Sequence, residues 1–548
     1  MFALEKYRFA QSASRCRMMF LASIACLATV GQAGASTLVV CIDTSPQSLN
    51  PALAWTTINM TVANAYYNRL VEIERGGGLV VSALAESWEI SPDGKIYTLH
   101  LRKGVKFHTT KTFTPSRDFN ADDVIFSVQR YRDKDNPYYD VGTNDYFNYL
   151  KIGEQITDIK RVNDYTLQLT LAEPNGTFLA TLANEPMSIQ SAEYAAKMLK
   201  AGTREKLDNE PVGTGPFQLL QYQKDATIRY RKFEDYWAIQ AGHPESGALV
   251  DELVFSITPD PSVRVAKLKA GECQIAVGPN PTDLLDLKSS PVVGIELVTA
   301  RSAATGFMGF NSERPPFDDA RVRKAIAMAI NKAAIVKLVF GNLVGVAANS
   351  PIPPDIWGHA DLNPVPYDPE AAKVLLAEVG HGEGLTLNLL YSDTRGSIWL
   401  PNQTRAAELI QADLKAVGIT ANVRKMEVSQ FRAARQGGEH DLFFTGWVMD
   451  YPHPNGAFDG LYNCDAGKAS GLRWCNQEFD KLFYEARNEA DQAKATDLYR
   501  RLQDIVANEI PAYVIANPII IVPISTAVKG FKIHTFGGQP YWGVSVKE

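Results

Sequence analysis

Strands and helices alternate along much of this 548-residue chain, and this order restricts the possible folds more than any other feature. Residues 253–277 are the clearest case: a strand (LVFSI), a turn (TPDPS), a short helix (VRVAKLKA), Gly271 and a second strand (CQIAV). The pattern predicts two parallel strands joined by a right-handed crossover. Further strands are expected at 38–42, 306–311, 385–391, 419–425, 441–447 and 512–522. Helices are expected from Asp319 to before Gly341, over 404–417, and twice within 477–508. The predicted fold class is α/β.

Residues 85–124 predict a β-hairpin followed by the start of a helix. A strand over 85–90 leads to the turn Ser91-Pro92-Asp93-Gly94, and the chain returns through an alternating apolar and polar segment. Asn120 then precedes two aspartates, which interact favourably with the positive end of a helix dipole. Many β-rich proteins contain such a hairpin, so the pattern alone does not indicate a function.

Residues 1–35 have the three parts of a secretory signal peptide: a basic start, an apolar run at 18–30 and the cleavage sequence Ala33-Gly34-Ala35. The apolar run is shorter than the roughly 20 residues that a membrane-spanning helix needs. The residues before Cys26 are a poor lipoprotein signal. Removing the segment takes away four basic residues and one acidic residue, so the net charge changes from −6 to −9. We expect an exported protein without a nucleic-acid partner.

Four cysteines follow this segment: Cys41, Cys273, Cys464 and Cys475. An even number in an oxidising compartment predicts two disulfides, for which three pairings are possible. The short spacing favours Cys464–Cys475, which leaves Cys41–Cys273. Zinc is the alternative ligand for such cysteines, but no C-x-x-C pair occurs, so we expect no metal.

Motifs of common enzymes are absent from the sequence. It contains no G-x-S-x-G, H-E-x-x-H or G-x-x-x-x-G-K-[ST] segment. Gly213-Thr214-Gly215 lacks the third glycine of a dinucleotide-binding loop and is followed by Pro216, so a tight turn is predicted there. The eight histidines have no metal-ligand spacing. We therefore expect neither catalysis nor a cofactor.

As a string, residues 85–124 resemble the signature of the periplasmic peptide-binding proteins of ABC importers, solute-binding protein family 5. This family includes dipeptide-, oligopeptide-, nickel- and haem-binding proteins, and the resemblance is greatest to the dipeptide-binding members. It extends from Leu38 to Glu548 and includes YYNRLVEI (66–73), PVGTGPFQLLQYQKDATIRY (211–230) and FSITPDPSVRVAKLKAGECQ (255–274).

The resemblance implies a two-lobed periplasmic-binding-protein (Venus-flytrap) fold in which two crossovers join the lobes around a cleft. Lobe I is expected at 36–299 plus 520–548, with an extra subdomain at 75–205, and lobe II at 300–519. The family has the same two disulfide pairs. A bound ligand would favour closure of the lobes, and the closed surface would dock on the permease subunits of an ABC importer. A periplasmic monomer is expected.

The strongest candidate for ligand binding is Asp450, in the segment Gly446-Trp447-Val448-Met449-Asp450-Tyr451. A desolvated carboxylate at a strand end binds an ammonium group well, because buried charges need partners. In the family, the aspartate of this G-W-x-x-D phrase binds the α-amino group of the peptide. The alternative is an aspartate that caps a turn, since prolines follow. Trp447, Met449 and Tyr451 are expected to contact the ligand beside it.

Arg395 is the candidate for the ligand's carboxylate, because a guanidinium can bind a carboxylate through two hydrogen bonds. The dipeptide-binding proteins use an arginine in the corresponding loop. Here Arg395 precedes Pro401 by six residues, a departure from the family pattern, and a solvated loop arginine is the alternative. Trp399 in the same loop, with Trp447, would either wall a side-chain pocket or pack in the ordinary way.

Two further segments are candidates for ligand contact. The loop Trp55-Thr56-Thr57-Ile58 aligns with a family segment of lobe I that touches ligand, so Thr56 and Thr57 are expected at the cleft; a surface turn is the alternative. Gly306 begins a strand that could donate backbone hydrogen bonds to an extended peptide by β-augmentation.

The resemblance thus implies a protein that binds dipeptides or short peptides. Alternatives within the family are a ligand such as haem, an antimicrobial peptide or another cationic solute. A secreted α/β hydrolase is the nearest alternative of another class and would turn over a peptide or ester. A structural or chaperone protein is a third possibility and would hold no stoichiometric small ligand.

Overall fold

The structure, a computed structural model, describes residues 35–547 apart from 54–55, 143, 244–245, 342, 393–396 and 490. Contacts divide the chain into residues 1–35 and residues 36–548, and the second unit is described below. The predicted signal peptide lies outside the described residues except for Ala35. None of the helices in the described part of the chain has the length and apolarity that crossing a bilayer requires.

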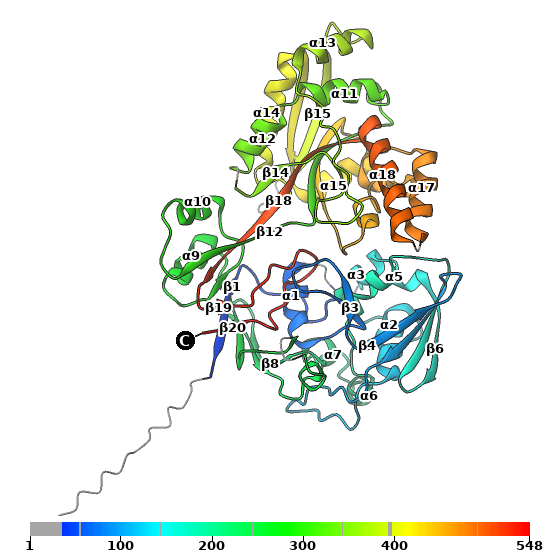
Figure 1. The fold of residues 1–548 in the computed structure, drawn as a ribbon, viewed down its shortest axis with the longest axis vertical. Coiled ribbons are helices and arrows are strands. Elements are labelled where there is room, and N and C mark those ends of the chain that lie inside the picture. The colour runs from blue at the N-terminus through cyan, green and yellow to red at the C-terminus, as the bar shows by residue number, and fades with distance from the viewer. Residues whose placement is uncertain are drawn as a thin grey trace, which may run out of the picture. The chain divides into compact units, whose positions relative to one another are not determined.

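Twelve of the strands in the described residues form one mixed sheet (Figure 1). From one edge to the other its order is β16 (Ile419–Met426), β15 (Leu385–Ser392), β17 (Leu442–Val448), β13 (Ala304–Phe310), β18 (Ala512–Ser525), β11 (Ile275–Ala276), β1 (Thr37–Ile42), β10 (Glu252–Ile257), β9 (Thr227–Lys232) and β8 (Phe217–Gln223). β12 (Ile295–Arg301) and β14 (Gly345–Ala347) also pair with β18. Helices join these strands, so the α/β prediction is confirmed.

β18, drawn in red in Figure 1, belongs to both halves of this sheet. Residues 512–518 pair with β13 and β14, and residues 519–525 pair with β12 and β11. β12 and β13 are consecutive in the chain and pair with β18 one after the other. The chain therefore passes between the two halves twice, once along β12–β13 and once along β18. The predicted lobe boundaries at 299/300 and 519/520 lie close to these passages and remain predictions.

The predicted strand–helix–strand unit is present, but its two strands are not neighbours. β10 and β11 both pair parallel to β1, one on each side of it. α9 (Pro261–Lys269) joins them and packs with Val265 and Leu268 buried. A local sequence pattern could not show that the first strand of the chain is inserted here. A disulfide joins Cys41 of β1 to Cys273, just before β11, with Cα atoms 5.9 Å apart.

A separate four-stranded antiparallel sheet has the order β4 (Ala85–Ile90), β5 (Ile96–Leu101), β7 (Thr166–Leu171) and β6 (Ile156–Asn163). β4 and β5 are the predicted hairpin. At its turn, the N–H of Gly94 donates to the carbonyl of Ser91 at 2.8 Å, and Gly94 has a φ of +70° that favours glycine. The hairpin prediction is confirmed.

α2 (Ala121–Arg132) begins at the predicted residue. The Asn120 side chain accepts from the N–H of Asp122 at 2.9 Å, and the Asn120 N–H donates to the Asp123 carboxylate at 3.0 Å. This reciprocal arrangement is a capping box.

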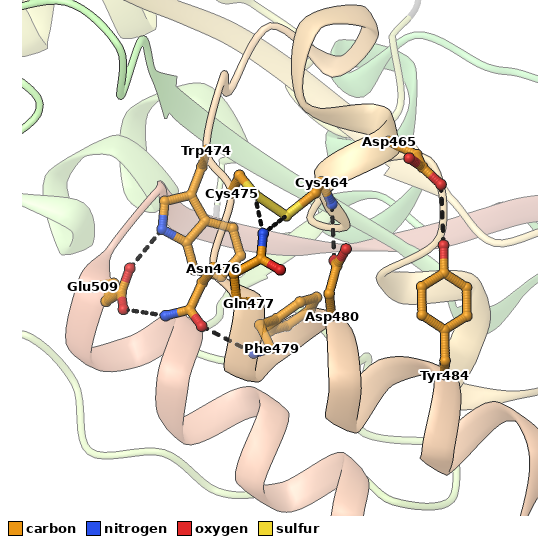
Figure 2. The surroundings of a disulfide bond; sticks show 10 residues. All are labelled: Cys464, Asp465, Trp474, Cys475, Asn476, Gln477, Phe479, Asp480, Tyr484 and Glu509. Carbon is orange, nitrogen blue, oxygen red and sulfur yellow. Dashed lines mark hydrogen bonds between the residues drawn. A yellow bond between two sulfur atoms is a disulfide. The ribbon is translucent and has the colours of Figure 1, made fainter.

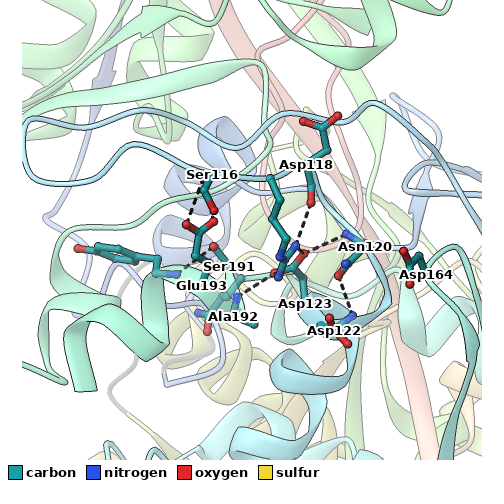
Figure 3. Close-up of polar contacts among 12 residues, drawn as sticks. Ser116, Asp118, Asn120, Asp122, Asp123, Asp164, Ser191, Ala192 and Glu193 are labelled. Atoms are coloured by element: carbon teal, nitrogen blue, oxygen red, sulfur yellow. Dashed lines mark hydrogen bonds and ion pairs between the residues drawn. The ribbon is translucent and has the colours of Figure 1, made fainter. Parts of the chain in front are cut away.

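Asp123 also connects α2 to α6 (Ala192–Lys200), as Figure 3 shows. Its fully buried carboxylate accepts two hydrogen bonds from the Arg117 guanidinium, at 2.7 and 2.9 Å, and one from the Ala192 N–H at 2.8 Å. Burial raises the pKa of the Asp123 carboxyl, and Arg117 opposes this shift. The carboxylate is thus satisfied from three segments of the chain.

The single helix predicted from Asp319 to before Gly341 is wrong. The structure has α11 (Ala320–Ala329) and α12 (Lys332–Val339) instead. Asn331 caps α12 through a 2.9 Å hydrogen bond from the Ala334 N–H, and its own N–H donates to the Asp413 carboxylate at 2.9 Å. An asparagine side chain competes with helical backbone hydrogen bonds, so this pair of contacts ends one helix and begins another.

Other helices of the β13–β16 half are α13 (Pro369–Glu378), α14 (Gln403–Ala416), α15 (Val428–Gly437), α17 (Gln477–Asn488) and α18 (Gln492–Glu509). The Cys464–Cys475 disulfide lies beside α17 (Figure 2). Glu509, at the end of α18, accepts hydrogen bonds from Trp474 Nε1 at 2.6 Å and Asn476 Nδ2 at 2.5 Å. The disulfide segment is thereby held against both helices.

We expect Asp123→Ala to lower the free energy of unfolding by about 2–4 kcal/mol, because it leaves the Arg117 charge and the Ala192 N–H without a partner. Asp122→Ala is the matched control on the same turn. Asp122 is exposed and pairs with exposed Arg161, so its loss should lower stability by under about 1 kcal/mol. Urea unfolding monitored by circular dichroism measures both. Equal effects of the two substitutions would contradict this account of Asp123.

Candidate functional site

Asp450 lies where β17 ends, beside the link between β12 and β13. Val448 pairs with Ala304, and the Met449 N–H donates to the carbonyl of Ala303 at 2.9 Å. Continuing this antiparallel register by one residue brings Asp450 opposite Ser302. The candidate carboxylate is therefore next to one of the two places where the chain passes between the halves of the sheet.

The charge of Asp450 is poorly compensated in this structure. Its side chain is only partly exposed, and burial raises the pKa of its carboxyl from 3.8 to about 7. The negative charges of Asp459 and Glu185 raise this pKa further, whereas a hydrogen bond with Tyr146 lowers it. Within the part of the chain that the structure describes, no positive charge is among the groups that act on it. A cation bound here would remove the electrostatic penalty, since an opposite charge favours the ionised form.

Segments that the sequence assigns to different lobes meet around Asp450. Tyr146 and Glu185 belong to the predicted subdomain at 75–205, whereas Asp450 follows β17 in predicted lobe II. Nearby, the N–H of Gly176 donates to the carbonyl of Arg487 at 3.2 Å. The surroundings of the candidate carboxylate are thus built from both parts of the chain.

Trp399 lies against a pair of glycines. Gly306 on β13 and Gly446 on β17 are opposite each other in the sheet. A Cβ on Gly446 would lie 2.1 Å from Trp399 Cγ, and a Cβ on Gly306 would lie 2.1 Å from the Trp399 carbonyl oxygen. Any larger residue at either position would displace Trp399. The partly buried indole therefore packs in the ordinary way against the neighbouring core, and a role as a pocket wall remains a prediction.

Ligand contact by Gly306 through backbone hydrogen bonds remains a prediction, and the pairing of its strand restricts how it could occur. β13 pairs with β17 over residues 304–310 and with β18 over residues 306–309. Both edges of the strand are therefore used within the sheet, and β-augmentation at Gly306 would require one of them to open.

Trp447, Met449 and Tyr451 are close to Asp450 in the sequence but largely serve packing. Met449 and Tyr451 are buried, and Trp447 Nε1 donates to the carbonyl of Gly456 at 2.6 Å. Trp447 and Met449 line a small pocket with Thr305, Phe307, Pro351, Ala457, Leu461 and Tyr462. The pocket is mainly apolar, and ligand contact by these three residues remains a prediction.

A larger cavity, of about 560 Å³ including its open mouth, lies next to the β12–β13 link. Its lining comes from four segments: Gly76–Gly78, Ala300–Ala303, Pro353 with Asp355 and Ile356, and Thr535 with Phe536. Ser302 is 2% exposed, and its hydroxyl has no hydrogen-bond partner in the described residues. A cavity of this size that contains an unsatisfied polar group fits a small, partly polar ligand.

The structure describes some, but not all, of the lobe I residues that are predicted to contact the ligand. Trp55 lies outside the described residues. Thr56 caps α1 (Thr57–Tyr66), and its hydroxyl donates to Asn59 Oδ1 at 2.8 Å. Thr57 is exposed at the first position of the helix. The two threonines thus begin a helix whose later residue Asn64 reaches Glu185, and their contact with ligand stays a prediction.

Arg395 lies outside the described residues, so the carboxylate clamp also remains a prediction. The described end of its loop reaches Trp399, which packs against Gly446, four residues before Asp450.

The Gly213-Thr214-Gly215 segment has a packing role, and the structure has a bend at 215–216, whereas the sequence predicts a tight turn over 213–215. A Cβ on Gly213 would lie 1.8 Å from the Tyr66 carbonyl oxygen, and the Gly215 N–H donates to the same oxygen at 3.0 Å. Glycine is needed because two backbones approach closely. In the described part of the chain, no group of three or more His, Cys, Asp or Glu residues is placed to hold a metal ion.

Sequence reasoning missed Glu185, Tyr146, Asp459 and Ser302. Tyr146, Glu185 and Ser302 are far from Asp450 in the chain, and Asp459, nine residues after it, belongs to no recognisable motif, so no local signal marked them. Only the contacts of the folded chain bring them to Asp450.

The two halves of the sheet, which the chain joins twice and which have a cavity next to one of the joins, are typical of a two-lobed binding protein. A family model described as "Bacterial extracellular solute-binding proteins, family 5 Middle" matches residues 80–469. The chain therefore belongs to the family 5 solute-binding proteins, which confirms the predicted family and the predicted two-lobed fold. Members of this family bind solutes for transport, so the protein is not an enzyme and the hydrolase alternative is excluded.

The curated relatives extend over nearly the whole chain. It is 40% identical to the dipeptide-binding protein of Escherichia coli (strain K12) over 531 residues, which are 96% of this chain and 97% of the relative. It is 41% identical to haem-binding protein A of Haemophilus influenzae over 520 residues, 93% and 92% of the two chains.

Solved structures agree with these relatives. HbpA2 from Haemophilus parasuis has a TM-score of 0.87 and 36% identity, covering 93% of this chain and 100% of that one. The dipeptide-binding protein from Pseudoalteromonas sp. SM9913, in complex with Met-Leu, has a TM-score of 0.78 and 33% identity with the same coverage.

We expect Gly446→Ala to lower the free energy of unfolding by about 1–3 kcal/mol, because its methyl group would displace Trp399 from the sheet. Gly437→Ala is the matched control: its Cβ would meet only Glu439 Oε1, at 3.9 Å, and its φ is ordinary. That substitution should be neutral or slightly stabilising in the last turn of α15. Chemical unfolding of both variants measures the difference, and equal stabilities would contradict the packing of Trp399 described above.

Proposed function

We propose that this protein captures dipeptides or short peptides in the cavity beside Asp450 and delivers them to the permease subunits of an ABC importer. It acts as a monomer in the periplasm after residues 1–35 are removed as a signal peptide. The observation that carries the proposal is the Asp450 carboxylate, which is partly buried and, among the described residues, has negative charges but no positive charge acting on it.

The chemistry of the site favours a ligand with an ammonium group. An ionised carboxylate in a desolvated position is unfavourable unless a charged donor pairs with it. The α-amino group of a peptide supplies a positive charge and three N–H donors. Binding of such a group by Asp450 would restore the ordinary, ionised state of the carboxyl and stabilise the complex.

The relatives support a peptide as the ligand. The E. coli relative is named a dipeptide-binding protein, and the Pseudoalteromonas structure contains Met-Leu. A further structure, DppA from Helicobacter pylori in complex with the peptide STSA, has a TM-score of 0.76 and 31% identity over 93% of this chain and 98% of that one. We infer that the present chain binds the same class of solute.

Haem is the second candidate, since one of the similar proteins is named haem-binding protein A. A haem carries two propionate groups, which are negative at neutral pH. Asp450, Asp459 and Glu185 would repel them. The charge of the site therefore favours a peptide ammonium over haem.

Arg395 is the proposed partner of the peptide's carboxylate, and Thr56, Thr57, Trp399, Trp447, Met449 and Tyr451 are proposed to shape the rest of the site. Trp399 supports this arrangement, because its packing on Gly446 brings the end of the Arg395 loop to the strand that precedes Asp450. A ligand held by both lobes would shift the protein toward its closed form, provided that it binds that form more tightly.

We expect Asp450→Ala to weaken dipeptide binding by about 2–5 kcal/mol, because removing one partner leaves the ligand's ammonium buried without an acceptor. Isothermal titration of refolded, ligand-free protein with Ala-Phe measures the effect. Asp465→Ala is the control, since Asp465 is exposed and hydrogen-bonded to Tyr484 in the segment shown in Figure 2. An affinity of the Asp450 variant equal to that of the control would refute the assignment.

Dipeptide affinity should fall as the pH is lowered below about 7. The raised pKa of the Asp450 carboxyl means that a proton competes with the ligand's ammonium, and the limiting loss is about tenfold per pH unit. Above pH 8 the peptide's own amino group loses its charge, so affinity should be highest between these values. Asp450→Asn should bind dipeptides weakly, and its affinity should not fall further as the pH is lowered, because the variant has no carboxylate to protonate at this position. A wild-type affinity that stays constant from pH 7.5 to 5.5 would show that Asp450 does not bind the ammonium group.

A further inference from the structure

Glu185 is a second buried carboxylate near Asp450. It begins the short helix η1 (Glu185–Met187) in the predicted subdomain and is 4% exposed. Its carboxylate accepts hydrogen bonds from the Gly538 N–H at 2.8 Å and from Asn64 Nδ2 at 3.3 Å. Both donors are uncharged, and within the described residues Glu185 forms no ion pair with Lys, Arg or His.

The neighbours of Glu185 hold it in place without neutralising it. A Cβ on Gly537 would lie 2.5 Å from Glu185 Oε1, so the C-terminal segment packs directly against the carboxylate. Asn64 Oδ1 accepts from Arg69 Nη1 at 2.6 Å, so the Asn64 amide lies between the Arg69 guanidinium and Glu185. A carboxylate that is buried this deeply and lacks a charged partner is unfavourable unless a ligand supplies one.

Contacts connect Glu185 to Asp450. The Tyr146 hydroxyl is within hydrogen-bonding reach of Asp450, and it also lies 3.3 Å from Oδ1 of Asn184, the residue before Glu185, so its one proton can serve either oxygen. The negative charge of Glu185 is one of the influences that raise the pKa of the Asp450 carboxyl. Two carboxylates from opposite lobes therefore share one poorly solvated region.

Neither carboxylate lines the larger cavity, but residues that line it contact the neighbours of both. Ser302 and Ala303 line one part of it, and the carbonyl of Ala303 is bonded to Met449, the residue before Asp450. Phe536 lines another part and precedes Gly537, which touches Glu185. The buried hydroxyl of Ser302, which has no partner among the described residues, is a third polar group there.

We propose that Glu185 is the second carboxylate that binds the ligand's ammonium group, so that one cation joins the two lobes. This inference rests on the proposed function. Without a ligand, closure brings two negative charges together in a region of low dielectric constant, which opposes it. An ammonium ion between them converts this repulsion into two attractive contacts, and its three N–H donors match Asp450, Glu185 and the free acceptor of Ser302. Closure of the two lobes then depends on the positive charge of the ligand.

Glu185→Gln tests the proposal because it keeps the shape and the acceptor oxygen but removes the charge. Glu193→Gln is the matched control: Glu193 is in the same predicted subdomain, and its partly exposed carboxylate accepts from the Ser116 N–H at 3.1 Å (Figure 3). Titration with Ala-Phe should show at least tenfold weaker binding for Glu185→Gln and a change under twofold for the control. N-acetyl-Ala-Phe, which has no ammonium group, should not lose affinity in Glu185→Gln.

Small-angle X-ray scattering of the ligand-free proteins supplies the second readout. Glu185→Gln should have a smaller radius of gyration than wild type, because the repulsion that opposes closure is reduced. Weaker Ala-Phe binding with unchanged scattering would overturn the proposal, since it would assign Glu185 an ordinary structural role. Wild-type affinity together with wild-type scattering would overturn it as well.

The failure of the proposed function would be recognised separately. If wild-type protein binds neither Ala-Phe nor other dipeptides, the peptide assignment is wrong. The scattering of ligand-free wild type and Glu185→Gln still decides whether the two carboxylates oppose closure, because that comparison needs no ligand.

Discussion

The structure depends on one strand, β18, which pairs with two different sets of neighbouring strands. β18 has 14 residues, and its hydrogen bonds pass from β13 and β14 to β12 and β11 between Pro518 and Ile519. β12 and β13 follow each other along the same strand. Both halves of the sheet are therefore tied to one continuous backbone, and the chain passes between them near residues 302 and 518. The candidate carboxylate Asp450 follows β17, next to the first of these passages.

Uncompensated negative charge is the second organising feature. Folded proteins pair buried charges or avoid them, and this protein does so elsewhere: Arg130 and Asp208, both buried, form two hydrogen bonds at 3.0 Å. Asp123 is likewise satisfied by Arg117 and two N–H groups. Asp450 and Glu185 differ because their donors are uncharged. A buried carboxylate without a charged partner is expected at a functional site, where a bound ligand can supply the opposite charge.

Much of the local structure could be read from the sequence, because it depends on short-range chemistry. The β4–β5 hairpin follows from its turn residues, and the start of α2 follows from Asn120 and Asp123, which act within one turn of each other. The break between α11 and α12 was missed because Asn331 is fixed by Asp413, 82 residues further along the chain. For the same reason the paired edges of β13 could not be anticipated: both partner strands come from residues beyond 440. Local patterns predict that a strand exists but not which strands flank it.

The sequence by itself determined the family, the α/β class and the candidate carboxylate Asp450, because each is carried by contiguous residues that can be compared or interpreted directly. Only the tertiary structure decided what surrounds that carboxylate. Glu185, Tyr146 and Ser302 come from three segments separated by more than a hundred residues from Asp450, and desolvation, which sets the charge state of the site, is a property of the packed chain. A sequence specifies which groups can be charged, but the distances and the loss of water that give those charges their energy exist only once the chain has folded.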